Sequence, residues 1–68
     1  MAARVIVNGR ELSVDLPSTI EIFLAAQNLP PRSVVVELNG EAVAASEIAT
    51  RELHPGDRLE VVRVVAGG

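Results

Sequence analysis

The feature that most constrains the fold is a pair of alternating apolar segments joined by Asn8-Gly9. Val5-Ile6-Val7 precedes this dipeptide, and Leu12-Ser13-Val14 follows it. Asn-Gly favours a type I′ turn because both central residues of that turn need positive φ. The sequence therefore predicts that the chain begins with a β-hairpin.

The register of this hairpin follows from its two-residue turn. If Val7 pairs with Arg10, Val5 lies opposite Leu12, and these four side chains share one face. Ile6 then points to the other face. We expect the first of these faces to be the buried one.

Length and composition indicate one small soluble domain. The chain has 68 residues, no cysteine, one histidine and a net charge of −3. Disulfides and a metal cluster are therefore not expected, and the core must be aliphatic around Phe23, the sole aromatic. A basic stripe with stacking aromatics, a bilayer-spanning segment and a signal peptide are all lacking. We therefore expect a cytoplasmic protein that contacts neither nucleic acid nor membrane.

A short helix is predicted after the hairpin, over residues 19–28. Ser18 is the expected N-cap, and Glu21 completes a capping box with it. Asn28 is expected to end the helix. The apolar residues at spacings of three and four are Ile20, Phe23 and Leu24.

A third strand is predicted over residues 33–38. Val34, Val36 and Leu38 should share one face, while Val35 and Glu37 should share the other. Asn39-Gly40 again indicates a turn, and residues 41–43 form at most a brief strand.

The segment 44–54 has the weakest pattern, and we expect irregular structure with one helical turn near 50–53. Pro55-Gly56-Asp57 predicts a tight turn in which the Asp57 side chain bonds nearby amides. The last strand is predicted over residues 58–65, with Leu59 and Val61 facing the core. His54 is expected to be an exposed loop residue.

This order of elements predicts an α+β fold in which a mixed sheet of four to five strands packs on one main helix. The simplest closure places the first and last strands side by side and parallel, through a right-handed crossover. That arrangement is the ubiquitin-like β-grasp, with strand order 2-1-5-3. We expect residues 1–65 to form a single β-grasp domain and residues 66–68 to form a flexible tail.

Gly67-Gly68 is the clearest candidate site. Residues without Cβ let the backbone enter a channel too narrow for side chains. The carboxylate of Gly68 could then be activated by another protein, which makes the chain a candidate acyl carrier. The chain itself offers no nucleophile, base and orienting group for catalysis, so no catalytic residue and no metal site is predicted.

A second candidate site is the outward face of the sheet. Alternation places Ile6, Val35, Val62 and Val64 on this face, where a contiguous aliphatic patch would dock a partner. The alternative is that valine simply favours strands. Glu11, Glu37 and Glu60 could assist docking to a basic partner, or form a solvated surface.

The chain resembles the ThiS family, the sulfur carriers of thiamine biosynthesis, along essentially its whole length. The residues that carry the match are Val7-Asn8-Gly9, Thr19, Leu24, Val36-Glu37-Leu38-Asn39-Gly40, Leu53, Gly56-Asp57 and Gly67-Gly68. One departure is Ala44-Ala45, where family members often carry Pro-Arg. This puts any partner contact of that Arg in doubt here.

The resemblance implies a sulfur carrier that is a cosubstrate and binds no cofactor. An E1-like adenylating enzyme would use ATP to adenylate Gly68, and sulfur from a donor such as a cysteine desulfurase would convert it to a thiocarboxylate. Thiazole synthase would then take up the sulfur. Ala66 and Gly67 would form the tail that enters these partners, and the free carrier would be a monomer.

Three alternatives remain open at this stage. The first is a carrier of the molybdopterin synthase small subunit type, although Val64-Val65-Ala66 lacks the prolines common before that tail. The second is a ubiquitin-like protein modifier that couples Gly68 to amines. The third is a β-grasp interaction module that does not react.

Overall fold

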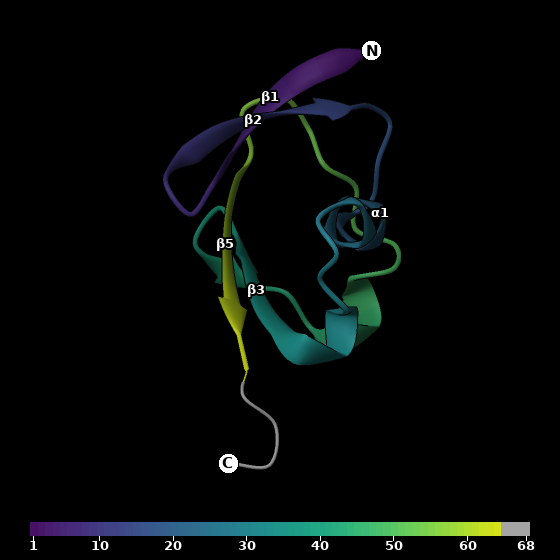
Figure 1. The fold of residues 1–68 in the computed structure, drawn as a ribbon, viewed down its shortest axis with the longest axis vertical. Helices are drawn as coiled ribbons and strands as arrows, with labels where there is room; N and C mark the ends of the chain where they lie inside the picture. Colours follow the sequence, from purple (N-terminus) through teal and green to yellow (C-terminus); the bar gives the residue numbers. More distant parts are fainter. Residues whose placement is uncertain (65–68) are drawn as a thin grey trace.

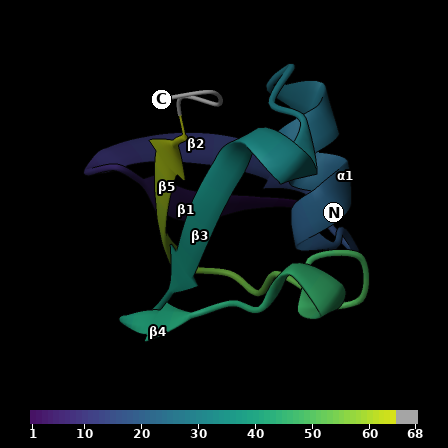
Figure 2. The ribbon, with the colours of Figure 1, turned by 90° about the horizontal axis from the view of Figure 1, so that it is seen from below.

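The computed structural model describes residues 1–64. A five-stranded mixed sheet is covered on one face by one α-helix, as Figures 1 and 2 show. The elements are β1 (Ala2–Val7), β2 (Arg10–Asp15), α1 (Ile20–Ala26), the 3-10 helix η1 (Pro31–Ser33), β3 (Val34–Leu38), β4 (Glu41–Ala42), the 3-10 helix η2 (Ala45–Glu47) and β5 (Arg58–Arg63).

The order of the sheet is β2-β1-β5-β3-β4, and β1 and β5 run parallel at its centre. The predicted β-grasp topology is therefore confirmed, with β4 added at one edge. The hairpin register is confirmed too, because Val7 pairs with Arg10 and Val5 with Leu12. Asn8 has φ 50° and Gly9 φ 83°, as a type I′ turn requires.

The predicted N-cap of the helix is wrong by one residue. Thr19 caps α1, and its hydroxyl oxygen accepts a hydrogen bond from the Ile22 amide at 3.2 Å. Ser18 is buried instead, and its hydroxyl donates to the Thr19 carbonyl, so the Ser18–Glu21 capping box does not form. The helix is also shorter than predicted, and it is followed by Asn28 at φ 59°.

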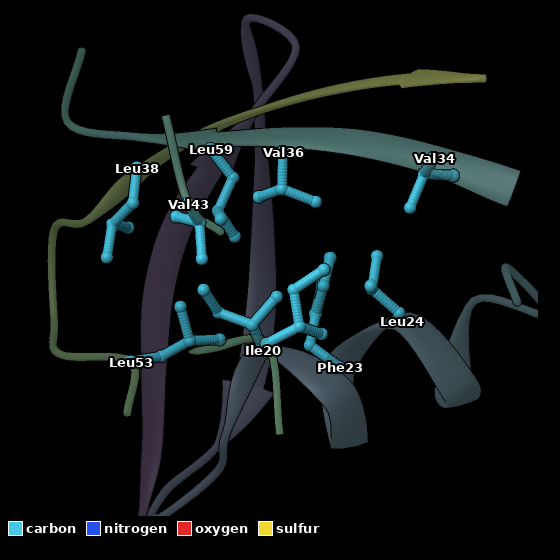
Figure 3. Packing of buried hydrophobic residues seen from close by; sticks show 10 residues of the cluster. Ile20, Phe23, Leu24, Val34, Val36, Leu38, Val43, Leu53 and Leu59 are labelled. Carbon is cyan, nitrogen blue, oxygen red and sulfur yellow. The ribbon is translucent and has the colours of Figure 1, made fainter. Parts of the chain in front are cut away.

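The core lies between α1 and the inner face of the sheet, as Figure 3 shows. The predicted stripe of the helix meets the predicted inner residues of β3 and β5 there. Hydrophobic residues that are at least 95% buried include Val5, Ile20, Phe23, Leu24, Val36, Leu38, Ile48, Leu53 and Leu59. The strand period of two and the helix period of 3.6 thus identified the buried faces of β3, β5 and α1.

The segment between β4 and β5 closes the other side of the core. Its helical turn is η2, so the predicted turn near 50–53 is misplaced. Ile48 and Leu53 are buried, and the Ile20 and Leu53 amides donate to the carbonyls of Arg51 and Ser18 at 2.9 Å each. These bonds tie the segment to the start of α1, a long-range contact that local sequence does not indicate.

Candidate functional site

Strand β5 connects the body of the domain to the candidate tail. β1 holds one side of β5 through parallel pairs that end at Val7 and Leu59. β3 holds the other side through antiparallel pairs from Leu38–Leu59 to Val34–Arg63. The first residues of β5 are therefore paired with both β1 and β3. The last residues of β5 are paired with β3 alone.

The side chain of Asn8 continues the ladder where β1 stops. Its Oδ1 accepts a hydrogen bond from the Val61 amide at 2.8 Å, and its Nδ2 donates to the Val61 carbonyl at 3.1 Å. The side-chain amide thus takes the place of one more strand residue beside β5. The sequence indicates only a turn role for Asn8, since a contact across this sequence separation has no local signal.

Asn39, from the second Asn-Gly turn, holds the start of β5. Its Oδ1 accepts from the Arg58 amide and its Nδ2 donates to Asp57 Oδ1, each at 3.0 Å. Asp57 Oδ2 also accepts from the His54 amide at 2.7 Å, which confirms the predicted turn role of Asp57. The two asparagines therefore hold β5 at its first residue, Arg58, and at Val61, and we call these contacts the asparagine clamp.

Replacing Asn8 by glycine tests this clamp. Glycine tolerates φ 50° but loses both bonds to Val61, so we expect unfolding to become easier by about 1–2 kcal/mol. Urea denaturation measures this loss, and amide hydrogen exchange should quicken at Val61. Asn28→Gly is the matched control, because Asn28 also has positive φ but makes no side-chain hydrogen bond within residues 1–64. An equal loss of unfolding free energy in Asn8→Gly and Asn28→Gly would contradict a stabilising role of the Asn8 side chain.

The structure brings together three of the four predicted docking residues. Val35 pairs directly with Val62 across β3 and β5, and the Val64 amide donates to the Ser33 carbonyl at 2.8 Å. The exposed fractions are 53% for Val35, 61% for Val62 and 48% for Val64. We call these three residues the aliphatic patch.

Ile6 does not belong to the aliphatic patch. It is half-buried and pairs with Arg58, at the opposite end of β5 from Val62. Four residues of strand separate these two positions, which is about 13 Å. The sequence correctly put Ile6 on the outward face, but the stagger between β1 and β5 decided its distance from the valines.

An acidic pair adjoins the aliphatic patch. Glu37 lies directly opposite Glu60, two pairs along the ladder from Val35 and Val62, which makes it the next pair on the same outward face. Neither carboxylate forms a salt bridge within residues 1–64. Like charges directly opposite one another oppose strand pairing, so this pair does not serve stability. Glu11 differs, because it pairs with Arg4 at 3.3 Å.

The candidate carrier residues Ala66, Gly67 and Gly68 lie outside the described residues. Within residues 1–64, no helix is long and apolar enough to cross a bilayer. Over that same range, no three His, Cys, Asp or Glu side chains gather as a metal site would need. His54 is exposed and its Nδ1 lies 3.8 Å from Asp57 Oδ2.

The fold and the position of β5 define the class: a small β-grasp protein whose central strand leads into a Gly-Gly segment. The ThiS family model matches residues 2–68, which is nearly the whole chain and includes Gly67 and Gly68. The chain belongs to the ThiS family, the sulfur carriers of thiamine biosynthesis, which act as carriers rather than catalysts.

Solved structures support this assignment. The crystal structure of a thiamine biosynthesis protein (ThiS) from Geobacter metallireducens is similar with a TM-score of 0.80 and 28% identity, over 96% of this chain and 99% of that one. A solution structure from the same organism gives a TM-score of 0.78, also at 28% identity, covering 96% of this chain and 87% of that one.

A curated relative carries the resemblance as part of a longer protein. A thiazole synthase of Paramagnetospirillum magneticum is 34% identical over 65 residues, which is 96% of this chain. The chain spans 20% of the length of that relative. In that thiazole synthase, a segment similar to this chain is therefore part of a longer polypeptide.

Proposed function

We propose that this protein carries sulfur as a thiocarboxylate on Gly68 and delivers it for the thiazole ring of thiamine. The observation that carries this proposal is the family match, which extends through Gly67-Gly68 beyond the central strand β5. A carboxylate is a poor electrophile, so a partner must activate it before sulfur can be attached.

The chemistry requires two steps, both in partner proteins. In an E1-like adenylating enzyme, the Gly68 carboxylate attacks the α-phosphate of ATP and expels pyrophosphate, which forms an acyl-adenylate. A sulfur nucleophile, in the simplest case hydrosulfide, then attacks the carbonyl carbon. A C–S bond forms, the C–O bond to AMP breaks, and the sulfur loses its proton. In the cell, a cysteine desulfurase is the sulfur source we propose.

We propose that thiazole synthase receives the sulfur. The relative named thiazole synthase supports this partner, since it contains a segment similar to this chain. A carrier covalently joined to its acceptor is a natural arrangement for two proteins that must meet. The carrier supplies the sulfur and the docking surface, and the acceptor supplies the catalytic groups.

The aliphatic patch is the proposed docking surface for these partners. Three exposed valines lie together on the outward face of β3 and β5, beside the strand that leads into the tail. Glu37 and Glu60 next to them favour a partner with a basic side chain, which would relieve their mutual repulsion. A partner seated here is well placed to receive residues 66–68.

Intact-mass measurement tests the proposed function directly. The protein is incubated with ATP, hydrosulfide and the cell's adenylating enzyme, and we expect the mass increase of one oxygen replaced by sulfur. Omitting ATP should abolish the change. An isopeptide adduct on another protein would instead indicate a modifier. An unchanged mass with a competent enzyme would refute the carrier role.

Replacing Val62 by aspartate tests the aliphatic patch. A charge in a desolvated apolar contact should raise the KM for the carrier in adenylation by about tenfold or more. Ile22→Asp is the matched control, since Ile22 is 57% exposed on α1 and the same charge is introduced away from β5. Thermal unfolding confirms that both variants fold. If Val62→Asp has the same KM as the wild type, the aliphatic patch is not part of the docking surface.

A further inference from the structure

A second surface lies on the other side of β5, at the same end of the molecule as the aliphatic patch. An open pocket of about 330 Å³ is formed between the tip of the β1–β2 hairpin, the end of α1 and the last residues of β5. Figure 2 shows the end of β5 on the same side as the start of β3 and the end of α1. The apolar residues that line this pocket are Val7, Leu12, Phe23, Leu29, Val34 and Val61.

The rim of this pocket is basic. Arg10 from β2 and Arg63 from β5 line it, and none of its lining residues is acidic. Within residues 1–64, neither arginine forms a salt bridge, whereas Arg4 and Arg51 do. In a chain of net charge −3, this is a local excess of positive charge that no carboxylate of residues 1–64 neutralises through a salt bridge.

Strand alternation links this pocket to the tail. Val62 and Val64 point outward to the aliphatic patch, and Val61 and Arg63 point inward to the pocket. A protein that encloses the residues after β5 therefore meets both faces of this strand. A volume near 330 Å³ is at the low end for small-molecule sites, and it suits one or two side chains of a protein.

We propose that this pocket is a second contact surface for the adenylating enzyme. The enzyme places an apolar side chain in the pocket and at least one carboxylate against Arg10 and Arg63. This inference rests on the proposed function and extends it. Beside the aliphatic patch the outward face presents Glu37 and Glu60, whereas the pocket rim presents Arg10 and Arg63, so the two surfaces accept the enzyme in one orientation only.

Charge reversal of the rim tests the proposal. We expect R63E and R10E each to raise the KM for the carrier by about tenfold or more in adenylation, with kcat retained. R10E is the more informative variant, because Arg10 lies on β2 and not on the strand that leads into the tail. R58E is the matched control, since Arg58 is exposed at the opposite end of β5 and the charge change is identical.

The outcomes separate this inference from the proposed function. If the wild-type protein is not adenylated by a competent enzyme, the proposed function itself fails. If the wild type reacts and R10E and R63E keep its KM, the carrier role stands and the second surface is refuted. An equal rise in R58E would also overturn it, because the effect would then come from net charge. Thermal unfolding verifies that each variant folds.

Discussion

Replacing Gly67 by valine is expected to abolish thiocarboxylate formation while leaving the fold intact. The branched Cβ of valine would meet the walls of a partner channel that admits only backbone. A misplacement of the Gly68 carboxylate by about 1 Å can cost about 100-fold in rate. We therefore expect the rate of adenylation to fall by about 100-fold or more.

The binding surfaces of this variant remain, because the aliphatic patch and the basic pocket belong to residues 1–64. Gly67→Val should therefore still bind the adenylating enzyme and act as a competitive inhibitor of the wild type. Intact mass measures the modification, and inhibition of pyrophosphate exchange measures the binding. Normal sulfur loading of Gly67→Val would refute a narrow channel around the tail.

Replacing Leu59 by alanine is expected to have the largest effect on stability. Leu59 is fully buried in β5, where it packs between the sheet and the helix (Figure 3). Leu→Ala in a core costs about 2–5 kcal/mol through lost burial and a residual cavity. The total stability of a domain of 68 residues is about 3–10 kcal/mol, so this one change removes a large share.

Urea denaturation of three variants measures this effect. Leu59→Met keeps the volume and should cost less than about 1.5 kcal/mol. Val62→Ala, on the same strand but 61% exposed, should cost less than Leu59→Ala by at least about 1 kcal/mol. A Leu59→Ala protein as stable as Val62→Ala would mean that Leu59 does not anchor the core.

The predictions that held were those with a local physical cause. Asn8-Gly9 and Asn39-Gly40 specify turns because both residues of each turn have positive φ in the structure. A two-residue turn between alternating strands then leaves one register for the hairpin. The buried faces of β3 and β5 follow from the same period of two.

The predictions that failed lacked such a cause. Ser18 and Thr19 are both good N-caps by residue type. The choice between Ser18 and Thr19 as N-cap depended on long-range contacts. Ser18 is buried, and its carbonyl accepts a hydrogen bond from the amide of Leu53 in the segment before β5. The helical turn before β5 was misplaced for the same reason, since long-range contacts to α1 arrange that segment.

The candidate site also has features with a local cause in the sequence and features that depend on long-range packing. The family resemblance and the outward face of the valines could be read from residue types and alternation. The separation of Ile6 from the aliphatic patch could not, because it depends on the stagger of β1 against β5. The role of Asn8 at Val61 depends on the same stagger, which leaves the β1 side of β5 without a strand partner at that point, while β3 still pairs on the other side.

The sequence by itself determined the turns, the strand faces, the order of elements and the family, because each depends on neighbouring residues or on a linear motif. Only the tertiary structure decided which distant side chains meet. The parallel pairing of β1 with β5 brings Asn8 to Val61. The strand order β2-β1-β5 brings Arg10 and Arg63 to one pocket, which Phe23 and Gln27 also line. Such contacts are set by the relative placement of whole elements, which no local pattern encodes.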